Sequence, residues 1–151
     1  MYEEKLKEMG IELPEAPKPL AAYVPAMQAG AFVYTSGQVP IAAGELKFKG
    51  KVGADLTEEQ GYEAAKLCAV NCLSAVKTVT GSLDKIAQIV KVTGFVNSAP
   101  GFTGQPKVIN GASEFFSQVF GDAGIHARAA VGVSELPVNA AVEIEIVVML
   151  N

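Results

Sequence analysis

The sequence of 151 residues is poor in the residues that build metal sites and disulfide frameworks. It contains one histidine, His126, and two cysteines, Cys68 and Cys72, which lie four positions apart in a predicted helix. Cysteines on successive turns of one helix rarely form a structural disulfide, and there is neither a paired Cys-x-x-Cys nor a second histidine for zinc. We therefore expect no metal site and interpret both cysteines as buried, reduced thiols.

Charge is also scarce, and the balance is acidic. Charged residues make up 19% of the chain, and 12 Lys and Arg against 16 Asp and Glu give a net charge of −4. Binding to nucleic acid requires a concentrated basic face, so no nucleic-acid partner is expected, whereas a local basic pocket for a small anion fits this balance. The low charge favours a surface covered by another subunit over a surface that simply carries more alanine.

Long apolar runs are missing as well. No run approaches the roughly 20 residues that cross a bilayer, and residues 1–10 are charged and amphipathic, unlike a signal peptide. We expect a cytoplasmic protein without membrane contact. The length suits one domain spanning residues 1–151, in which residues 1–19, with a proline-rich stretch, form an N-terminal extension.

Hydrophobic periodicity, with glycine and proline as breakers, predicts an α+β fold. Thr57 and Gln60 form a capping box at the start of the longest helix, and Ala29-Gly30 is predicted to turn the first strand into the second. The predicted helices are 2–9, 57–80 and 108–120, and the predicted strands are 23–28, 32–36, 48–52, 86–96, 127–133 and 142–149. We expect the two longer helices to cover one face of a mixed sheet and to leave the other face open.

The last two predicted strands carry charged side chains next to very small ones. Alternation places Glu143 and Glu145 on the face opposite the β-branched residues of 142–149. It places Arg128, Ala130 and Gly132 together, which we interpret as a cavity floor whose guanidinium binds a carboxylate through two hydrogen bonds. The alternative is a surface arginine paired with Glu143 or Glu145 across the strands.

Two longer motifs resemble those of a known family. Tyr-Thr-Ser-Gly-Gln-Val-Pro at 34–40 resembles the early signature of Rid (YjgF-like) proteins. His-Ala-Arg-Ala-Ala-Val-Gly-Val-Ser-Glu-Leu-Pro at 126–137, followed by Val-Glu-Ile-Glu at 142–145, resembles their C-terminal signature. The resemblance implies a fold like that of the bacillar chorismate mutase, with two helices on one sheet face. It also implies a homotrimer joined through the open faces, with ligand clefts between subunits.

The resemblance further implies a reaction and roles for single residues. Well-known members hydrolyse 2-aminoacrylate-type enamines and imines to 2-keto acids and ammonia without a cofactor. The matching residues here are Arg128 for the substrate carboxylate, Glu143 for positioning the attacking water, the Ala130 carbonyl as a second water-holding group, and Tyr23, Ser36, Gly37 and Asn110 for the cleft. Taken alone, each of these last four is more often a structural hydrogen-bonding or turn residue.

Two departures from the family pattern leave alternatives open. Many members carry cysteine where this chain has Ala130, which excludes thiol chemistry at that position, and the loop 97–106 differs from the usual connection. The same arginine would serve a non-catalytic protein that binds a 2-keto acid or regulates in response to it. Endoribonuclease activity or inhibition of translation, ascribed to some members, is the less favoured alternative, because the net charge counts against RNA binding.

Overall fold

The computed structural model describes residues 1–16, 18 and 22–151. Positions 17 and 19 of the expected N-terminal extension thus lie outside the described residues. The helices are α1 (Tyr2–Glu8), α2 (Glu58–Thr80) and α3 (Gln105–Phe120), and short 3₁₀ turns occupy Leu83–Lys85, Gly121–Gly124 and Pro137–Asn139. The strands are β1 (Ala26–Ala29), β2 (Phe32–Thr35), β3 (Ile41–Ala42), β4 (Glu45–Leu46), β5 (Ile86–Asn97), β6 (Ala127–Val133) and β7 (Val142–Leu150).

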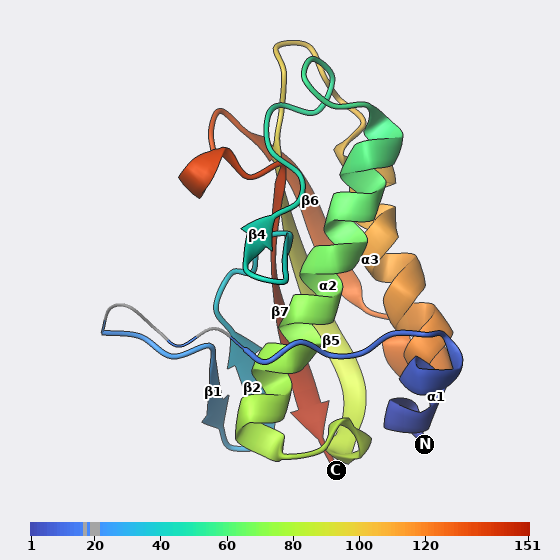
Figure 1. Ribbon diagram of the computed structural model, residues 1–151. Helices are drawn as coiled ribbons and strands as arrows, with labels where there is room; N and C mark the ends of the chain where they lie inside the picture. The colour runs from blue at the N-terminus through green and yellow to red at the C-terminus, as the bar shows by residue number, and fades with distance from the viewer. Residues whose placement is uncertain (17, 19–21) are drawn as a thin grey trace.

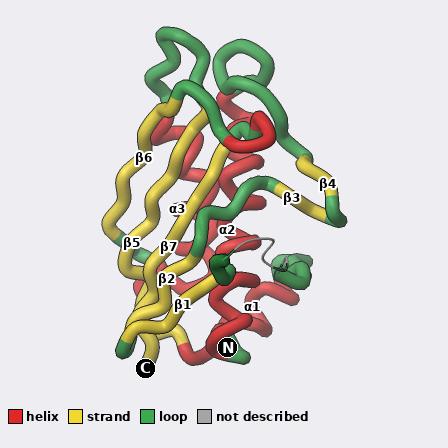
Figure 2. Tube along the Cα trace, turned by 90° about the vertical axis from the view of Figure 1, so that its left-hand side faces the viewer, coloured by secondary structure: helices red, strands yellow, loops and turns green. Residues whose placement is uncertain are grey.

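Five strands form one mixed sheet in the order β1-β2-β7-β5-β6 (Figure 2). β5 and β6 run parallel because α3 connects them as a crossover, and the other neighbours are antiparallel. The sequence neighbours β6 and β7 are therefore separated by β5. This order places β6 at one edge of the sheet and β7 at its centre.

α2 and α3 pack side by side on one face of the sheet, and α2 runs diagonally across the strands (Figure 1). α2 begins at the predicted capping box, in which Thr57 Oγ1 accepts from the amide of Gln60, and it ends at Gly81 in the left-handed conformation. The two helices approach closely because Gly111 faces the backbone of Tyr62, where an added Cβ would lie 2.0 Å from the carbonyl oxygen.

The core lies between this helical layer and the sheet. On β7, the residues Val142, Ile144, Ile146 and Val148 are buried under the helices, which confirms the predicted alternation. The opposite face carries Glu143, Glu145 and Val147, and no helix among the described residues covers it. The expected α+β fold with two helices on one sheet face is confirmed.

The N-terminal segment packs on the helices rather than on the open face. α1 contacts the end of α3 through Tyr2 and Phe120, whose ring centroids lie 4.5 Å apart. The chain then crosses α2 (Figure 1), where Ser74 Oγ donates a hydrogen bond to the carbonyl of Pro14. In the described residues, no helix combines the length and hydrophobicity needed to span a membrane.

Several local predictions were wrong. Residues 48–52 form only isolated bridges, since Gly50 and Gly53 take φ values of 115° and 97°, outside the extended region. The chain instead forms the small β3–β4 hairpin, whose turn at Ala43-Gly44 has two positive φ angles. The β1–β2 turn is centred on Gly30 and Ala31, one residue later than predicted.

α3 begins three residues earlier than predicted, because Pro106 fits the first turn of a helix, where its missing N–H leaves no hydrogen bond unmade.

Candidate functional site

The predicted site residues fall into two groups on opposite faces of the sheet. Directly paired residues of neighbouring strands point to the same face. Arg128 is paired with Val92, which is paired in turn with Ile146. Val92 and Ile146 are buried under the helices, so Arg128 points to the helix-covered face. Glu143 is paired with Phe95 on the open face. The alternative in which Arg128 pairs with Glu143 or Glu145 across the strands is therefore wrong.

The first group holds the guanidinium of Arg128 between β6 and α3. Nη1 donates to Asn110 Oδ1 at 2.8 Å and to Ser113 Oγ at 3.1 Å, and Nη2 donates to the Pro106 carbonyl at 3.2 Å. All three acceptors are uncharged. Within the part of the chain that the structure describes, no carboxylate forms a salt bridge with this arginine. The positive charge is thus fixed in place without being neutralised.

Ser113 and His126, which sequence reasoning did not select as site residues, complete this group. Ser113 Oγ lies 2.9 Å from His126 Nε2, and His126 Nδ1 lies 2.6 Å from the carbonyl of Gly124. Spacing contained a signal for both residues. Ser113 follows Asn110 by three positions on α3, so the two share a face of the helix, and His126 stands two residues before Arg128, immediately before β6 begins at Ala127.

Gly132 does not form a cavity floor beside Arg128. A Cβ at Gly132 would lie 2.7 Å from Gln105 Nε2 and 2.8 Å from Ser98 Oγ, so this space is already filled by the start of α3 and the loop before it. Ala130 packs against the core. The shallow cavity at Arg128 lies instead toward α3, with a volume of about 310 Å³, and is lined by Asn110, Ser113, Glu114, Ser117, Ile125, His126 and Arg128.

The second group places Glu143 against the segment that follows β2. Gln38 and Ile144 exchange two backbone hydrogen bonds of 2.8 and 3.0 Å, which holds this segment beside β7. An added Cβ at Gly37 would lie 2.5 Å from Glu143 Oε1, so the missing side chain of the glycine makes room for the carboxylate. Ser36 Oγ donates to the carbonyl of Val24 at 2.6 Å, which orients the hydroxyl.

Glu143 is partly buried, and its carboxyl binds a proton more readily than usual. Desolvation raises the pKa of Glu143 above its ordinary value of 4.5, and the nearby charge of Glu145 raises it further. A carboxylate with a raised pKa is a stronger base and can exchange a proton with a bound water nearer neutral pH.

A family model described as "YjgF/chorismate mutase-like, putative endoribonuclease" matches residues 3–150. Protein TCP17 of Trypanosoma cruzi is 43% identical over 97% of this chain and 92% of its own length. A 2-iminobutanoate/2-iminopropanoate deaminase of Dermatophagoides farinae is 33% identical over 93% of this chain and 95% of its own length. The crystal structure of Agrobacterium tumefaciens Atu1372, a protein of unknown function, is 46% identical with a TM-score of 0.93, covering 99% of this chain and 92% of that one.

The chain belongs to the YjgF family. The resemblance inferred from the two motifs is therefore confirmed. The region matched by the YjgF family model begins at residue 3, so it includes all of α1 except Tyr2.

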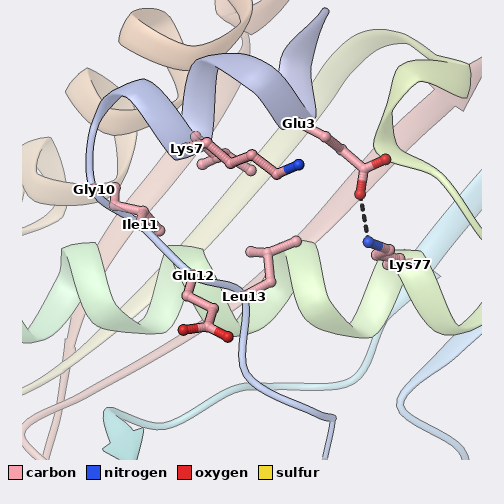
Figure 3. Close-up of a pocket in the computed structure, with 8 residues that line it drawn as sticks. Glu3, Lys7, Gly10, Ile11, Glu12, Leu13 and Lys77 are labelled. Atoms are coloured by element: carbon pink, nitrogen blue, oxygen red, sulfur yellow. Dashed lines mark hydrogen bonds and ion pairs between the residues drawn. The ribbon is translucent and has the colours of Figure 1, made fainter.

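In this YjgF-family chain, Tyr23, Ser36 and Gly37 line a second cavity, of about 430 Å³. Tyr23 is 59% exposed, and Pro25, Val39, Ile41 and Ala42 supply apolar lining. A third cavity of about 460 Å³ lies between α1, the following segment and α2, where Lys7 reaches across it and Lys77 pairs with Glu3 (Figure 3). It contains none of the predicted site residues. The candidate site therefore consists of the Arg128 group and the Glu143 group, the latter beside the cavity of Tyr23.

Proposed function

We propose that this protein is a cofactor-free deaminase that hydrolyses 2-aminoacrylate-type enamines and imines to 2-keto acids and ammonia. The observation that carries the proposal is the state of Arg128. Its guanidinium has five N–H donors, of which three bond to neutral protein acceptors. The other two belong to Nε and Nη2, which share one edge of the guanidinium, and such an edge binds a carboxylate through two parallel hydrogen bonds.

The proposed reaction needs only a held substrate and a positioned water. Arg128 binds the carboxylate of the imine, which fixes the position of the C=N carbon. Water adds to this carbon while Glu143 accepts a proton from the water and passes it to the nitrogen. The C–N bond of the resulting carbinolamine then breaks, ammonia leaves, and the carbonyl of the 2-keto acid forms. An enamine enters the same sequence after it tautomerises to the imine, a step that takes up a proton at carbon and releases one from nitrogen.

We further propose that the working site lies between protomers of a homotrimer. Within one protomer, Arg128 and Glu143 lie on opposite faces of the sheet. If both act on the same substrate, Arg128 of one protomer must therefore act together with Glu143 of a neighbouring protomer. The open face supports this arrangement because it carries exposed apolar side chains, namely Met27, Phe32, Tyr34 and Val131. A face of this kind is typical of a subunit interface.

A coupled assay tests the reaction. A dehydratase generates 2-aminoacrylate, and the release of ammonia and keto acid is followed with and without the protein. We expect faster release with the wild type and no acceleration with Arg128→Ala. If 2-oxobutanoate raises the melting temperature of the protein while release is not accelerated, the protein binds the acid without catalysis and the deaminase proposal is wrong.

Mixed assemblies test the shared site. Arg128→Ala and Glu143→Gln chains are refolded together, so that some interfaces combine an intact Arg128 from one chain with an intact Glu143 from its neighbour. We expect this mixture to regain part of the activity that each variant lacks alone. Recovery that is absent despite co-assembly, shown by differently tagged chains purifying together, would contradict a site built from two protomers.

A further inference from the structure

Arg128 is the last member of a chain of hydrogen bonds that begins at the backbone of Gly124. The order is Gly124 carbonyl, His126 ring, Ser113 hydroxyl, Arg128 guanidinium, with separations of 2.6, 2.9 and 3.1 Å. His126 is the single histidine of the sequence and Arg128 its single arginine. The histidine ring is further fixed by its edge-on packing against Phe116, with centroids 6.0 Å apart and an interplanar angle of 88°.

The chemistry of these groups gives the hydrogen bonds one direction. A backbone carbonyl only accepts, so the Nδ1 atom of His126 carries the proton of the first bond. In the neutral ring, Nε2 is then an acceptor, and the hydroxyl of Ser113 donates to it. The lone pairs of Ser113 Oγ are consequently available to the Nη1–H of Arg128.

Protonation of His126 would reverse this arrangement. Its Nε2–H would compete with Arg128 for the lone pairs of Ser113 and would place a second cation next to the guanidinium. Burial lowers the pKa of His126, and the charge of Arg128 lowers it further, so the neutral ring prevails at neutral pH. Among the residues that the structure describes, Glu114, on the same face of α3, is the one carboxylate that lines this cavity.

We propose that His126 and Ser113 are positioning residues, which hold the Arg128 guanidinium so that its Nε–Nη2 edge stays open to the carboxylate of the substrate. The identity of the ligand rests on the function proposed above. The geometry of the guanidinium does not, because it is set by Asn110 and Pro106 on one side and by the Ser113–His126 pair on the other.

Four variants test whether His126 and Ser113 position the Arg128 guanidinium or only fill space beside it. His126→Phe keeps the ring against Phe116 but removes the acceptor, and Ser113→Ala removes the bridging hydroxyl. His126→Gln is the rescue variant, because its amide oxygen can occupy the place of Nε2. Ser117→Ala is the matched control, since Ser117 lines the same cavity but makes none of the hydrogen bonds to Arg128.

Two measurements are made on each variant. NMR of the single guanidinium reports how fast it rotates about its Nε–Cζ bond, and this needs no ligand or activity. Calorimetry gives the Kd of 2-oxobutanoate. We expect rotation to be slow in the wild type, in His126→Gln and in Ser117→Ala, and faster in His126→Phe and Ser113→Ala. His126→Phe and Ser113→Ala should bind 2-oxobutanoate about tenfold more weakly. Ser113→Ala removes a hydrogen bond to the guanidinium, and His126→Phe removes the acceptor that orients the Ser113 hydroxyl.

The two measurements also separate the failure of this proposal from the failure of the proposed function. Guanidinium rotation that is unchanged in both His126→Phe and Ser113→Ala overturns the positioning role, whatever the protein binds. Binding of 2-oxobutanoate that is unaffected even by Arg128→Ala overturns the carboxylate site, while the rotation data still decide whether His126 and Ser113 hold the arginine. If His126→Phe does not fold, Ser113→Ala supplies both readouts.

Discussion

Arg128 and Glu143 carry opposite charges, and the protein surrounds them in different ways. Three neutral acceptors hold the arginine without cancelling its charge. The carboxylate lies partly buried against Gly37, with Glu145 nearby, and its pKa is raised. The arginine is thereby prepared to bind an anion, and the glutamate is prepared to take up and release a proton. Changes at each position should therefore affect different steps of the proposed reaction.

The largest loss of activity is expected for Glu143→Gln. The amide has nearly the same shape but cannot accept a proton from water, so kcat should fall by about 10²- to 10⁴-fold, the usual contribution of a general base. KM should change little, because the carboxylate of the substrate is held elsewhere. Steady-state kinetics with enzymatically generated 2-aminoacrylate measures both constants. A kcat within threefold of the wild type would remove Glu143 from the mechanism.

The thermal stability of Glu143→Gln tests whether the pKa of Glu143 is raised. A carboxyl whose pKa is higher in the folded state stabilises the fold while it is protonated, and this contribution is lost as the pH rises through the folded-state pKa. At neutral pH the ionised Glu143 thus costs stability that glutamine does not. Glu143→Gln should melt at a higher temperature than the wild type near pH 7, and the difference should shrink toward about pH 4. A difference that grows on acidification would show the opposite pKa shift.

Arg128→Lys should cause the next largest loss, by weakening substrate binding. A lysine keeps the charge but cannot bond to Asn110, Ser113 and Pro106 and also offer two parallel donors to a carboxylate. We expect kcat/KM to fall about a hundredfold, as is reasonable for the loss of two charge-assisted hydrogen bonds. Lys107→Arg, at an exposed position near the start of α3, is the control, because it shows whether an exchange between lysine and arginine outside the Arg128 group alters the kinetics. Unaltered kinetics in Arg128→Lys would mean that the planar edge of the guanidinium is not used.

A smaller effect, confined to the Glu143 group, is expected for Gly37→Ala. The added methyl would meet the end of the Glu143 side chain, which can turn away at little cost in stability. We expect kcat to fall about tenfold, since misplacing a catalytic group by an ångström is costly, while the melting temperature stays nearly unchanged. The double variant Gly37→Ala/Glu143→Gln should be no less active than Glu143→Gln alone. Additive losses would show that Gly37 acts by another route.

The same contrast shows what the sequence could predict. Alternation along β7 correctly placed Ile144 on the buried face and Glu143 on the opposite face, because a strand with one buried face carries its β-branched residues there. The capping box likewise located the start of α2. Alternation along β6 showed that Arg128, Ala130 and Gly132 share a face, but it did not show which face. That choice depends on the parallel pairing of β6 with β5, which is a long-range contact that no local pattern reveals.

The other wrong or missed predictions have separate physical causes. The stretch 48–52 contains Phe48 and Val52 and has strand composition, but Gly50 within it and Gly53 after it adopt conformations that end pairing after single bridges. The two-residue strands of the β3–β4 hairpin are too short for periodicity to register. Ser113 and His126 were missed for another reason. Their spacing from Asn110 and Arg128 was a signal, but the hydrogen bond that makes them important joins α3 to the residue before β6.

Thiol reagents are expected to have no effect on activity. The same experiment tests whether α2 stays packed against the helix-covered face of β7. Cys68 and Cys72 lie on α2, where their sulfhydryls donate to the carbonyls of Val142 and Ile144, on either side of Glu143. Burial raises the pKa of both thiols, so little of either is the reactive thiolate. Iodoacetamide should leave the folded protein unlabelled by mass spectrometry and fully active, and should label both cysteines after denaturation in guanidinium. Rapid labelling of the native protein would mean that α2 separates from β7, so that the strand carrying Glu143 is less rigid than its hydrogen bonds indicate.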